Sequence, residues 1–212
     1  MKITTLALLV LCLQATFSIA QSISIIPQPQ QMEFTTETLQ IKTKSNISIA
    51  NKSLLSAANL LKEDVSKVFD FQLNVKGKSG AVHLQIDKNL AEEHYQIEVT
   101  DQVLITGANY KTVVMGVSSF LQMAKRNGQY LAVPNGKITA FPANSFRSLM
   151  LDVARQPTTL ETLKQAVELC RLYKIRYLQI HFSDDQSYTF PSAHYPEIVT
   201  KDHSYTLAEM HE

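Results

Sequence analysis

The chain has 212 residues, and its 20 lysines and arginines nearly balance its 19 aspartates and glutamates, giving a formal net charge of +1. This balance, without any basic run, excludes a protein that binds nucleic acid by neutralising phosphates. The only cysteines, Cys12 and Cys170, are too few for the disulfide framework of a small secreted domain. Stability must therefore come from ordinary core burial, in one or two domains.

The first twenty residues predict an export signal. Lys2 gives a positive start, residues 6–13 form a short apolar run, and Ser18 and Ala20 are small residues at the positions that a signal peptidase reads. A membrane anchor is the weaker interpretation, because the apolar run is shorter than the ~20 residues that span a bilayer. We therefore expect a signal peptide over residues 1–20, no membrane span, and an exported protein that is periplasmic or extracellular.

Residues 21–143 predict a small α+β domain, with an antiparallel sheet and two helices. Apolar residues at three- and four-residue steps predict the helices, over 53–69 and 110–125. Gly128 is expected to end the second helix, and residues 134–142 are expected to form the loop that leaves the domain. Short alternating or apolar stretches predict strands at 39–41, 47–49, 71–75, 81–86, 95–99 and 103–105.

After this loop, the pattern becomes that of a parallel strand–helix–strand unit. Residues 149–153 and 177–182 are apolar runs that predict two buried strands. Thr158 and Glu161 fit a capping box for the helix between them, in which Cys170 is expected to pack as a small hydrophobe. A right-handed helical crossover with short loops makes the two strands parallel.

Polar residues follow both strands of this unit. Asp152 and Arg155 come at the end of the first strand, and His181, Asp184 and Asp185 come at the end of the second. Because the carboxyl ends of parallel strands meet at one edge of a sheet, we expect these side chains to converge around one pocket.

Several chemistries could use this group. Arg155 carries a planar fork of donors that suits either sugar hydroxyls or a carboxylate. His181, Asp184 and Asp185 could bind a metal ion, but adjacent carboxylates on one loop usually point apart, and no histidine pair at helical spacing indicates zinc. An ion pair between Arg155 and Asp184 could also close the strand ends without any ligand. We expect neither a metal nor a cofactor.

Two motifs resemble those of family 20 glycoside hydrolases, the β-N-acetylhexosaminidases. Residues 146–155 (FRSLMLDVAR) are similar to the family's first barrel strand and its Asp-x-x-Arg motif, and residues 180–186 (IHFSDDQ) to its second-strand His-x-[Ser/Thr/Val]-Asp-Asp-Gln motif. Residues 26–122 resemble the family's small α+β domain. The resemblance implies that residues 144–212 begin a (β/α)8 barrel of about 250 residues, truncated after its first βαβ portion.

The resemblance also implies an activity, the hydrolysis of terminal non-reducing β-linked GlcNAc or GalNAc. The family uses a retaining mechanism in which the acetamido group of the substrate is the nucleophile. By this resemblance Arg155 grips the hydroxyls of the terminal sugar and Asp184 supports the site from beneath. His181 and Asp185 lie behind them, and Asp152 anchors the loop that carries Arg155. The implied partner is an N-acetylhexosamine-terminated glycan or a chitooligosaccharide.

The family's general acid, a glutamate, and the adjacent aspartate lie on a later strand, and no suitable Asp-Glu pair follows Gln186. No catalytic residue is therefore expected in this chain, which we expect to be inactive alone and to aggregate through uncovered strand faces. The alternative function is a non-catalytic carbohydrate-binding or interaction module. An in-frame continuation beyond Glu212 that encodes an Asp-Glu pair would favour the enzyme, and a real stop codon with expressed protein would favour the module.

Overall fold

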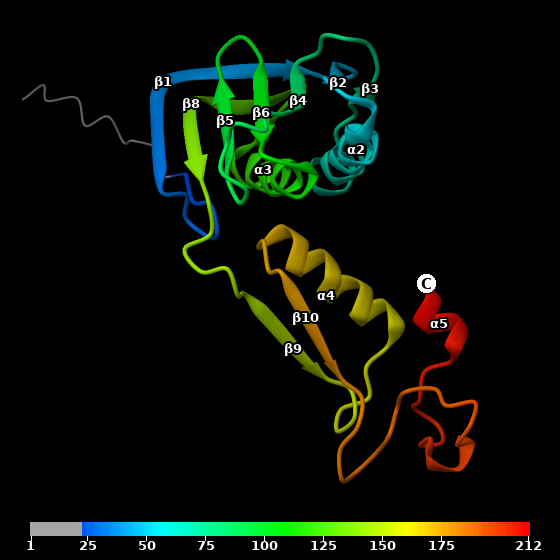
Figure 1. The fold of residues 1–212 in the computed structure, drawn as a ribbon. Coiled ribbons are helices and arrows are strands. Elements are labelled where there is room, and N and C mark those ends of the chain that lie inside the picture. The colour runs from blue at the N-terminus through cyan, green and yellow to red at the C-terminus, as the bar shows by residue number, and fades with distance from the viewer. Residues whose placement is uncertain (1–22) are drawn as a thin grey trace, which may run out of the picture.

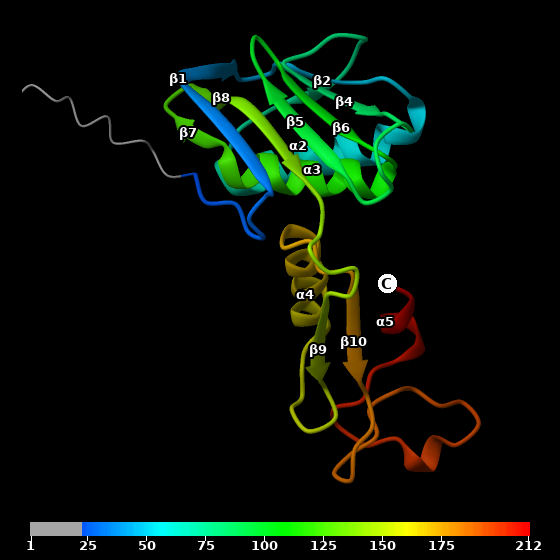
Figure 2. The ribbon, with the colours of Figure 1, turned by 60° about the vertical axis from the view of Figure 1, so that its left-hand side comes forward.

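The computed structural model describes residues 23–212, so the expected signal peptide lies outside the described part of the chain. The described residues form two parts, a sheet with two long helices on one face and, beside these helices, a pair of strands with one helix of its own (Figures 1 and 2). No helix within residues 23–212 is long and apolar enough to cross a membrane.

The first part is built on a mixed sheet of eight strands. These are β1 (Gln31–Lys42), β2 (Asn46–Ile49), β3 (Asn74–Val75), β4 (Val82–Ile86), β5 (Tyr95–Val99), β6 (Val103–Gly107), β7 (Lys125–Asn127) and β8 (Tyr130–Ala140). Their order is β1-β8-β5-β6-β4-β2-β3, with β7 pairing with β8 beside this path. The pairs β2–β3, β2–β4 and β4–β6 are parallel, and the other pairs are antiparallel.

The predicted antiparallel sheet is therefore wrong for the half that contains β2, β3, β4 and β6. For the pair β2–β3 the reason is helix α2 (Leu55–Phe69), which follows a short 3-10 turn, η1 (Lys52–Leu54), and lies between these strands in sequence. Such a helix carries the chain back along one face of the sheet, so that the next strand runs in the same direction as the last. The helix itself was predicted correctly, but its effect on strand direction was missed.

The predicted end of the second helix is also wrong. Helix α3 (Tyr110–Met123) has Ala124 as its C-cap, with extended backbone, and β7 begins directly after it. Gly128 instead lies in the turn between β7 and β8, where its φ of 58° suits glycine. An Asn-Gly pair favours a hairpin turn as much as a helix end, and here the hairpin forms.

The predicted exit loop at residues 134–142 lies largely in β8. Pro134 and Gly136 belong to this long strand, opposite the stretch where its pairing with β1 shifts register between Phe34 and Thr38. Gly136 allows the two backbones to approach closely, because a Cβ there would lie 2.1 Å from a carbonyl oxygen of β1. Proline and glycine thus mark an irregularity within a pair of strands.

The core lies between the sheet and the helices α2 and α3, which cover one of its faces (Figure 2). Gly116 of α3 lets the helix lie close to the sheet, since a Cβ there would be 2.5 Å from Cγ2 of Ile105. Burial of apolar area is the main stabilising term in such a core. The largest fully buried side chains are Phe120, Ile41, Ile47, Leu54, Leu61, Leu73, Leu84, Ile97, Ile105, Met123, Leu131 and Ile138.

The second part contains the parallel pair β9 (Ser148–Asp152) and β10 (Tyr177–His181), joined by helix α4 (Leu160–Leu172). The predicted strand–helix–strand unit is present, although Thr159 rather than Thr158 is the N-cap, accepting a hydrogen bond from the backbone N–H of Thr162. Cys170 is buried on α4, as expected. A loop region with η2 (Pro196–Ile198) and α5 (Leu207–His211) follows. That these strands belong to an eight-stranded barrel stays a prediction.

The C-terminal end of α4 is tied to the helices of the first part. The Arg171 guanidinium donates two hydrogen bonds of 2.8 Å to the carboxylate of Asp64 on α2. Ser118 of α3 donates to the carbonyl oxygen of Arg171 at 3.1 Å, and Gln122 of α3 donates to that of Leu172 at 3.1 Å. This junction holds the end of α4 against the first part.

Candidate functional site

The five predicted site residues lie at one end of the β9–β10 pair. His181 and Asp152 are paired directly across the two parallel strands, so both chains leave the sheet at the same edge. The loop after β9 carries Arg155, and the loop after β10 carries Asp184 and Asp185. The two loops are therefore neighbours because each follows the carboxyl end of one of two parallel strands, as the sequence predicted.

Arg155 lies between two carboxylates. Its Nε is 2.8 Å from Oδ2 of Asp152 and 3.0 Å from Oδ2 of Asp184. The Arg155 side chain is 54% exposed, whereas that of Asp184 is only 14% exposed. The two carboxylates thus hold the inner nitrogen of the guanidinium, and its Nη atoms donate no hydrogen bond within the described part of the chain.

Asp152 shapes the turn that carries Arg155. Its Oδ1 accepts hydrogen bonds from the backbone N–H groups of Ala154, at 3.1 Å, and of Arg155, at 3.0 Å. These contacts, and first of all the Arg155 N–H, lower the pKa of Asp152 below its usual value. The carboxylate therefore fixes both the backbone and the side chain of Arg155 while remaining ionised.

The loop after β10 holds Asp184 in a similar way. The Asp184 backbone N–H donates to the carbonyl oxygen of Ser187 at 2.9 Å, and its Oδ1 accepts from the N–H of Gln186 at 3.3 Å. A hydrogen bond with Asp185 is the largest cause that lowers the pKa of Asp184, and the same contact raises the pKa of Asp185. As pH falls, Asp185 takes up a proton first, so Asp184 keeps its charge for Arg155.

His181 points toward the same group without joining it by a hydrogen bond. Its Nε2 lies 3.7 Å from Oδ2 of Asp184 and is buried, with no hydrogen-bond partner among residues 23–212. Within residues 23–212, no group of three or more histidine, cysteine, aspartate or glutamate residues that could hold a metal ion is found.

Two hydroxyl residues that sequence reasoning missed hold these loops, Ser187 between the two loops and Thr189 within the loop after β10. Ser187 donates from Oγ to the carbonyl oxygen of Ala154, joining the β10 loop to the β9 loop, and Thr189 donates to that of Phe182 at 3.1 Å. Both residues are buried. Bonds from a hydroxyl to a backbone carbonyl depend on the shape of the loop, so no sequence spacing indicates them.

This arrangement can hold a neutral ligand that is rich in hydroxyl groups. The outer nitrogens of a planar guanidinium can each donate to an oxygen of a ring. The carboxylates behind Arg155 keep it in one orientation and are themselves acceptors. The structure thus brings all five predicted residues together, while their individual roles stay predictions.

The comparisons with known proteins point to one family. The profile of "Glycosyl hydrolase family 20, domain 2" matches residues 22–139, and that of "Glycosyl hydrolase family 20, catalytic domain" matches residues 144–211. A Porphyromonas gingivalis protein named beta-hexosaminidase is 24% identical over 193 residues, which cover 84% of this chain and 25% of the relative. A Vibrio furnissii beta-hexosaminidase is 24% identical over 181 residues, covering 85% and 30%. The chain thus spans between a quarter and a third of these relatives.

Solved structures show the same fold. The β-N-acetylhexosaminidase of Bacteroides fragilis aligns with a TM-score of 0.78 at 21% identity, covering 89% of this chain and 41% of that one. The Flavobacterium johnsoniae chitobiase aligns with a TM-score of 0.76 at 16% identity, covering 88% and 31%. Since the domain 2 profile alone matches more than half of the 212 residues, the chain belongs to glycosyl hydrolase family 20.

Proposed function

We propose that this chain is the sugar-holding start of a β-N-acetylhexosaminidase, which removes terminal non-reducing β-linked GlcNAc or GalNAc from glycans or chitooligosaccharides. One observation carries this proposal. Arg155 is held by Asp152 and Asp184 at the shared edge of two parallel strands, with its outer donors uncommitted within the described part. Relatives that match the chain are named beta-hexosaminidases, which supports the same substrate class.

The contacts of each residue support its proposed role. Arg155 donates to ring hydroxyls of the terminal sugar, and Asp184, which is largely buried and ionised, orients that guanidinium and accepts from the ligand. Asp152 positions Arg155 through its turn, and His181 and Asp185 act on Asp184 from behind. The strength of these contacts depends on the fork of the guanidinium, which a lysine cannot reproduce.

The chemistry itself needs groups that this chain does not carry. In substrate-assisted retaining hydrolysis the acetamido oxygen of the substrate attacks the anomeric carbon, while a protein acid protonates the leaving oxygen. We propose that residues 21–143 form the small domain and residues 144–212 the start of a catalytic barrel, in an exported protein. On this proposal the 212-residue chain binds sugar weakly and hydrolyses nothing.

The test is to express the chain together with whatever its reading frame encodes beyond Glu212 and to measure the release of nitrophenol from 4-nitrophenyl β-GlcNAc. We expect hydrolysis by the extended protein, and a loss of roughly 100-fold in kcat/KM for Arg155→Lys. Arg126→Lys is the matched control, because Arg126 also pairs with an aspartate, Asp70, but lies in the first part. It should leave kcat/KM unchanged.

Two outcomes would overturn this function. One is hydrolysis by the 212-residue chain alone, which would require a catalytic acid in a place where we find none. The other is hydrolysis by the extended protein that Arg155→Lys leaves unchanged. A genuine stop codon after Glu212, with expressed protein that binds GlcNAc through Arg155 and hydrolyses no glycoside, would instead indicate a carbohydrate-binding module.

A further inference from the structure

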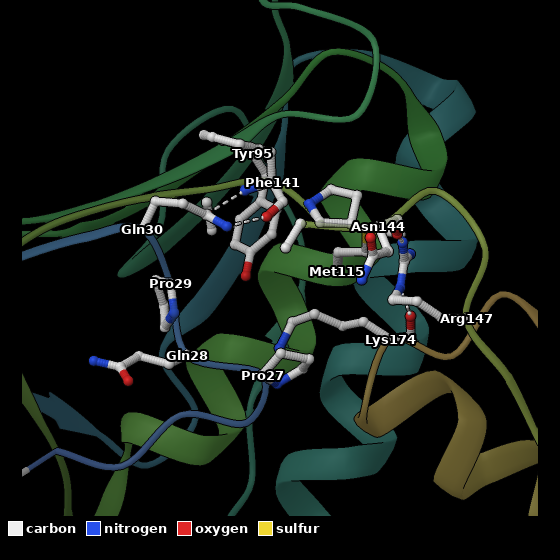
Figure 3. Close-up of a pocket in the computed structure, with 13 residues that line it drawn as sticks. Pro27, Gln28, Pro29, Gln30, Tyr95, Met115, Phe141, Asn144, Arg147 and Lys174 are labelled. Carbon is white, nitrogen blue, oxygen red and sulfur yellow. Dashed lines mark hydrogen bonds between the residues drawn. The ribbon is translucent and has the colours of Figure 1, made fainter.

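A second candidate site lies at the other end of the β9–β10 pair from Arg155. A cavity of about 250 Å³ opens where the entry segment at residues 27–30, the end of β8 and the starts of β9 and β10 meet (Figure 3). Arg147, just before β9, and Lys174, shortly before β10, both line it. Neither residue was among the predicted site residues, and neither contacts the Arg155 rim.

The walls of this cavity are mostly apolar. Pro27, Met115, Phe141 and the ring of Tyr95 face it in Figure 3. The Tyr95 hydroxyl is already used, because it is 2.7 Å from Oγ of Ser119. No aspartate or glutamate is among the described residues that line the cavity. Its interior therefore favours a ligand with an apolar body.

Lys174 brings a positive charge into these surroundings. The residue is 8% exposed, and Nζ donates one hydrogen bond, of 3.2 Å, to the carbonyl oxygen of Ile26. An ammonium group has three donors, so two remain. Within residues 23–212 no carboxylate lies within ion-pair distance of Nζ. A buried charge without an opposite charge is costly, and a bound anion would remove that cost.

Arg147 adds to the positive charge and does not neutralise it. Its Nε and Nη1 donate to the carbonyl oxygens of Lys174, at 2.8 Å, and of Asn144, at 2.6 Å. Its Nη2 is buried and has no hydrogen-bond partner in the described part. Glu93 is a carboxylate that the charge of Arg147 influences, but it is already paired with Lys111, whose Nζ lies 2.8 Å from its Oε1.

From this geometry we propose that the cavity binds a small organic carboxylate, whose oxygens accept from Nζ of Lys174 and whose apolar part lies against Met115 and Phe141. A volume of about 250 Å³ is below that of typical drug-sized pockets, so the ligand has about ten non-hydrogen atoms or fewer. A phosphate has no apolar part that could lie against the apolar side chains of this wall. The site is independent of the sugar-binding rim and does not rest on the proposed hydrolase function.

Binding should depend on pH in a defined direction. Burial, with a smaller effect from the positive charge of Arg147 in the same wall, lowers the pKa of Lys174 to about 8. Burial also raises the pKa of Tyr95, the hydroxyl group in the wall, to about 12. An anion favours the protonated amine. The affinity for a carboxylate should therefore be greatest below pH 8 and fall as pH rises above it.

The test uses hexanoate, its neutral analogue hexanamide and inorganic phosphate as probes in ligand-observed NMR titrations of the 212-residue chain. Lys174→Met removes the charge and keeps an apolar stem. Lys44→Met is the matched control, because Lys44 also has a left-handed backbone, with φ 63° against 59° for Lys174, but is exposed in the first part.

We expect hexanoate to bind at pH 7 at least tenfold more tightly than hexanamide, and Lys174→Met but not Lys44→Met to abolish the difference. Any of four results would overturn the proposal. These are equal binding of hexanoate and hexanamide, unchanged binding of hexanoate by Lys174→Met, tighter binding of phosphate than of hexanoate, and no binding of any probe. If Lys174→Met does not fold, the comparison of hexanoate with hexanamide on the unaltered chain still decides.

Discussion

The two parts of this chain differ in how far each one covers its own apolar surface. In the first part, the sheet and the helices α2 and α3 enclose one continuous core. In the second part, only Val153, Leu163 and Tyr205 form a buried apolar cluster. The candidate sugar-binding residues all lie in the second part. The part with the small core thus carries the site, and the part with the large core supports it.

The exposed apolar residues show the same difference. Met150 in the middle of β9 is 57% exposed, and Val167 and Leu169 on α4 are 56% and 48% exposed. A strand that was predicted to be covered on both faces is thus open within the described part. Apolar faces of this kind normally pack against further structure. We therefore expect the second part to need such further structure for its stability. The following substitutions test this contrast between the first and the second part.

The largest expected effect is in the first core. Phe120→Ala removes a fully buried ring and should lower the free energy of unfolding by about 3–5 kcal/mol. Leu163→Ala, in the smaller cluster, should cost about 2 kcal/mol or less, since the loosely packed surroundings can relax. Urea denaturation followed by circular dichroism measures both. Equal costs would mean that the second part is packed as firmly as the first.

The next effect concerns the junction of the two parts. Asp64→Asn weakens the bidentate pair with Arg171, whose side chains are only 11% and 23% exposed, and should cost about 2–3 kcal/mol. Lys67→Met, on the same helix, breaks the pair with Glu168, which is exposed to solvent and screened, and should therefore cost much less than Asp64→Asn. Amide hydrogen exchange should show reduced protection of α4 in Asp64→Asn. Protection of α4 that stays unchanged would contradict a junction role for this pair.

A third effect depends on pH. The pKa of Lys174 is about 8 in the folded protein, and an unfolded lysine titrates near 10.5. Between these values the unfolded state binds more protons, so the contribution of Lys174 to stability rises with pH, by about 1–2 kcal/mol from pH 8 to pH 10. Burial raises the pKa of Cys170, which acts in the opposite direction. The free energy of unfolding of the unaltered chain minus that of Lys174→Met, measured across this pH range, separates the effect of Lys174 from that of Cys170. If this difference does not change with pH, Lys174 is not desolvated.

The smallest effect concerns the contact between the two loops of the rim. Ser187→Ala removes the hydrogen bond from the buried hydroxyl to the carbonyl oxygen of Ala154 and should cost roughly 1 kcal/mol. Ser183→Ala, in the same loop, is the control, since the Ser183 side chain makes no hydrogen bond to any of residues 23–212. Thermal unfolding measures both variants. Identical melting temperatures would show that the loops are held together by other contacts.

Much of this architecture was predictable from local patterns. Helical periodicity located α2 and α3, a capping pattern between two apolar runs located α4, and the ends of these runs placed Arg155 and Asp184 at one edge. Both predictions depend on short stretches of sequence. The capping box was placed one residue early, at Thr158, because consecutive threonines precede α4 and only backbone geometry selects between them.

What was missed depends on contacts between distant segments. The parallel direction of β2 and β4 follows from a crossover, and the long strand β8 pairs on one side with β1, about a hundred residues away in sequence. The cavity at Lys174 is made by segments that are distant in sequence and that no local pattern connects. The direct pairing of Asp152 with Arg155 was only partly anticipated, as the anchoring of a loop.

The most direct test of the central claim is to follow the Arg155 Nε–Hε signal by NMR while GlcNAc is added to the 212-residue chain. We predict that this signal shifts on titration, that the Nε–Hε signal of Arg126 does not, and that Asp184→Asn weakens the response. A shift confined to residues of the first part, or no shift of the Arg155 signal at saturating GlcNAc, would contradict a sugar-binding role for the shared edge of β9 and β10.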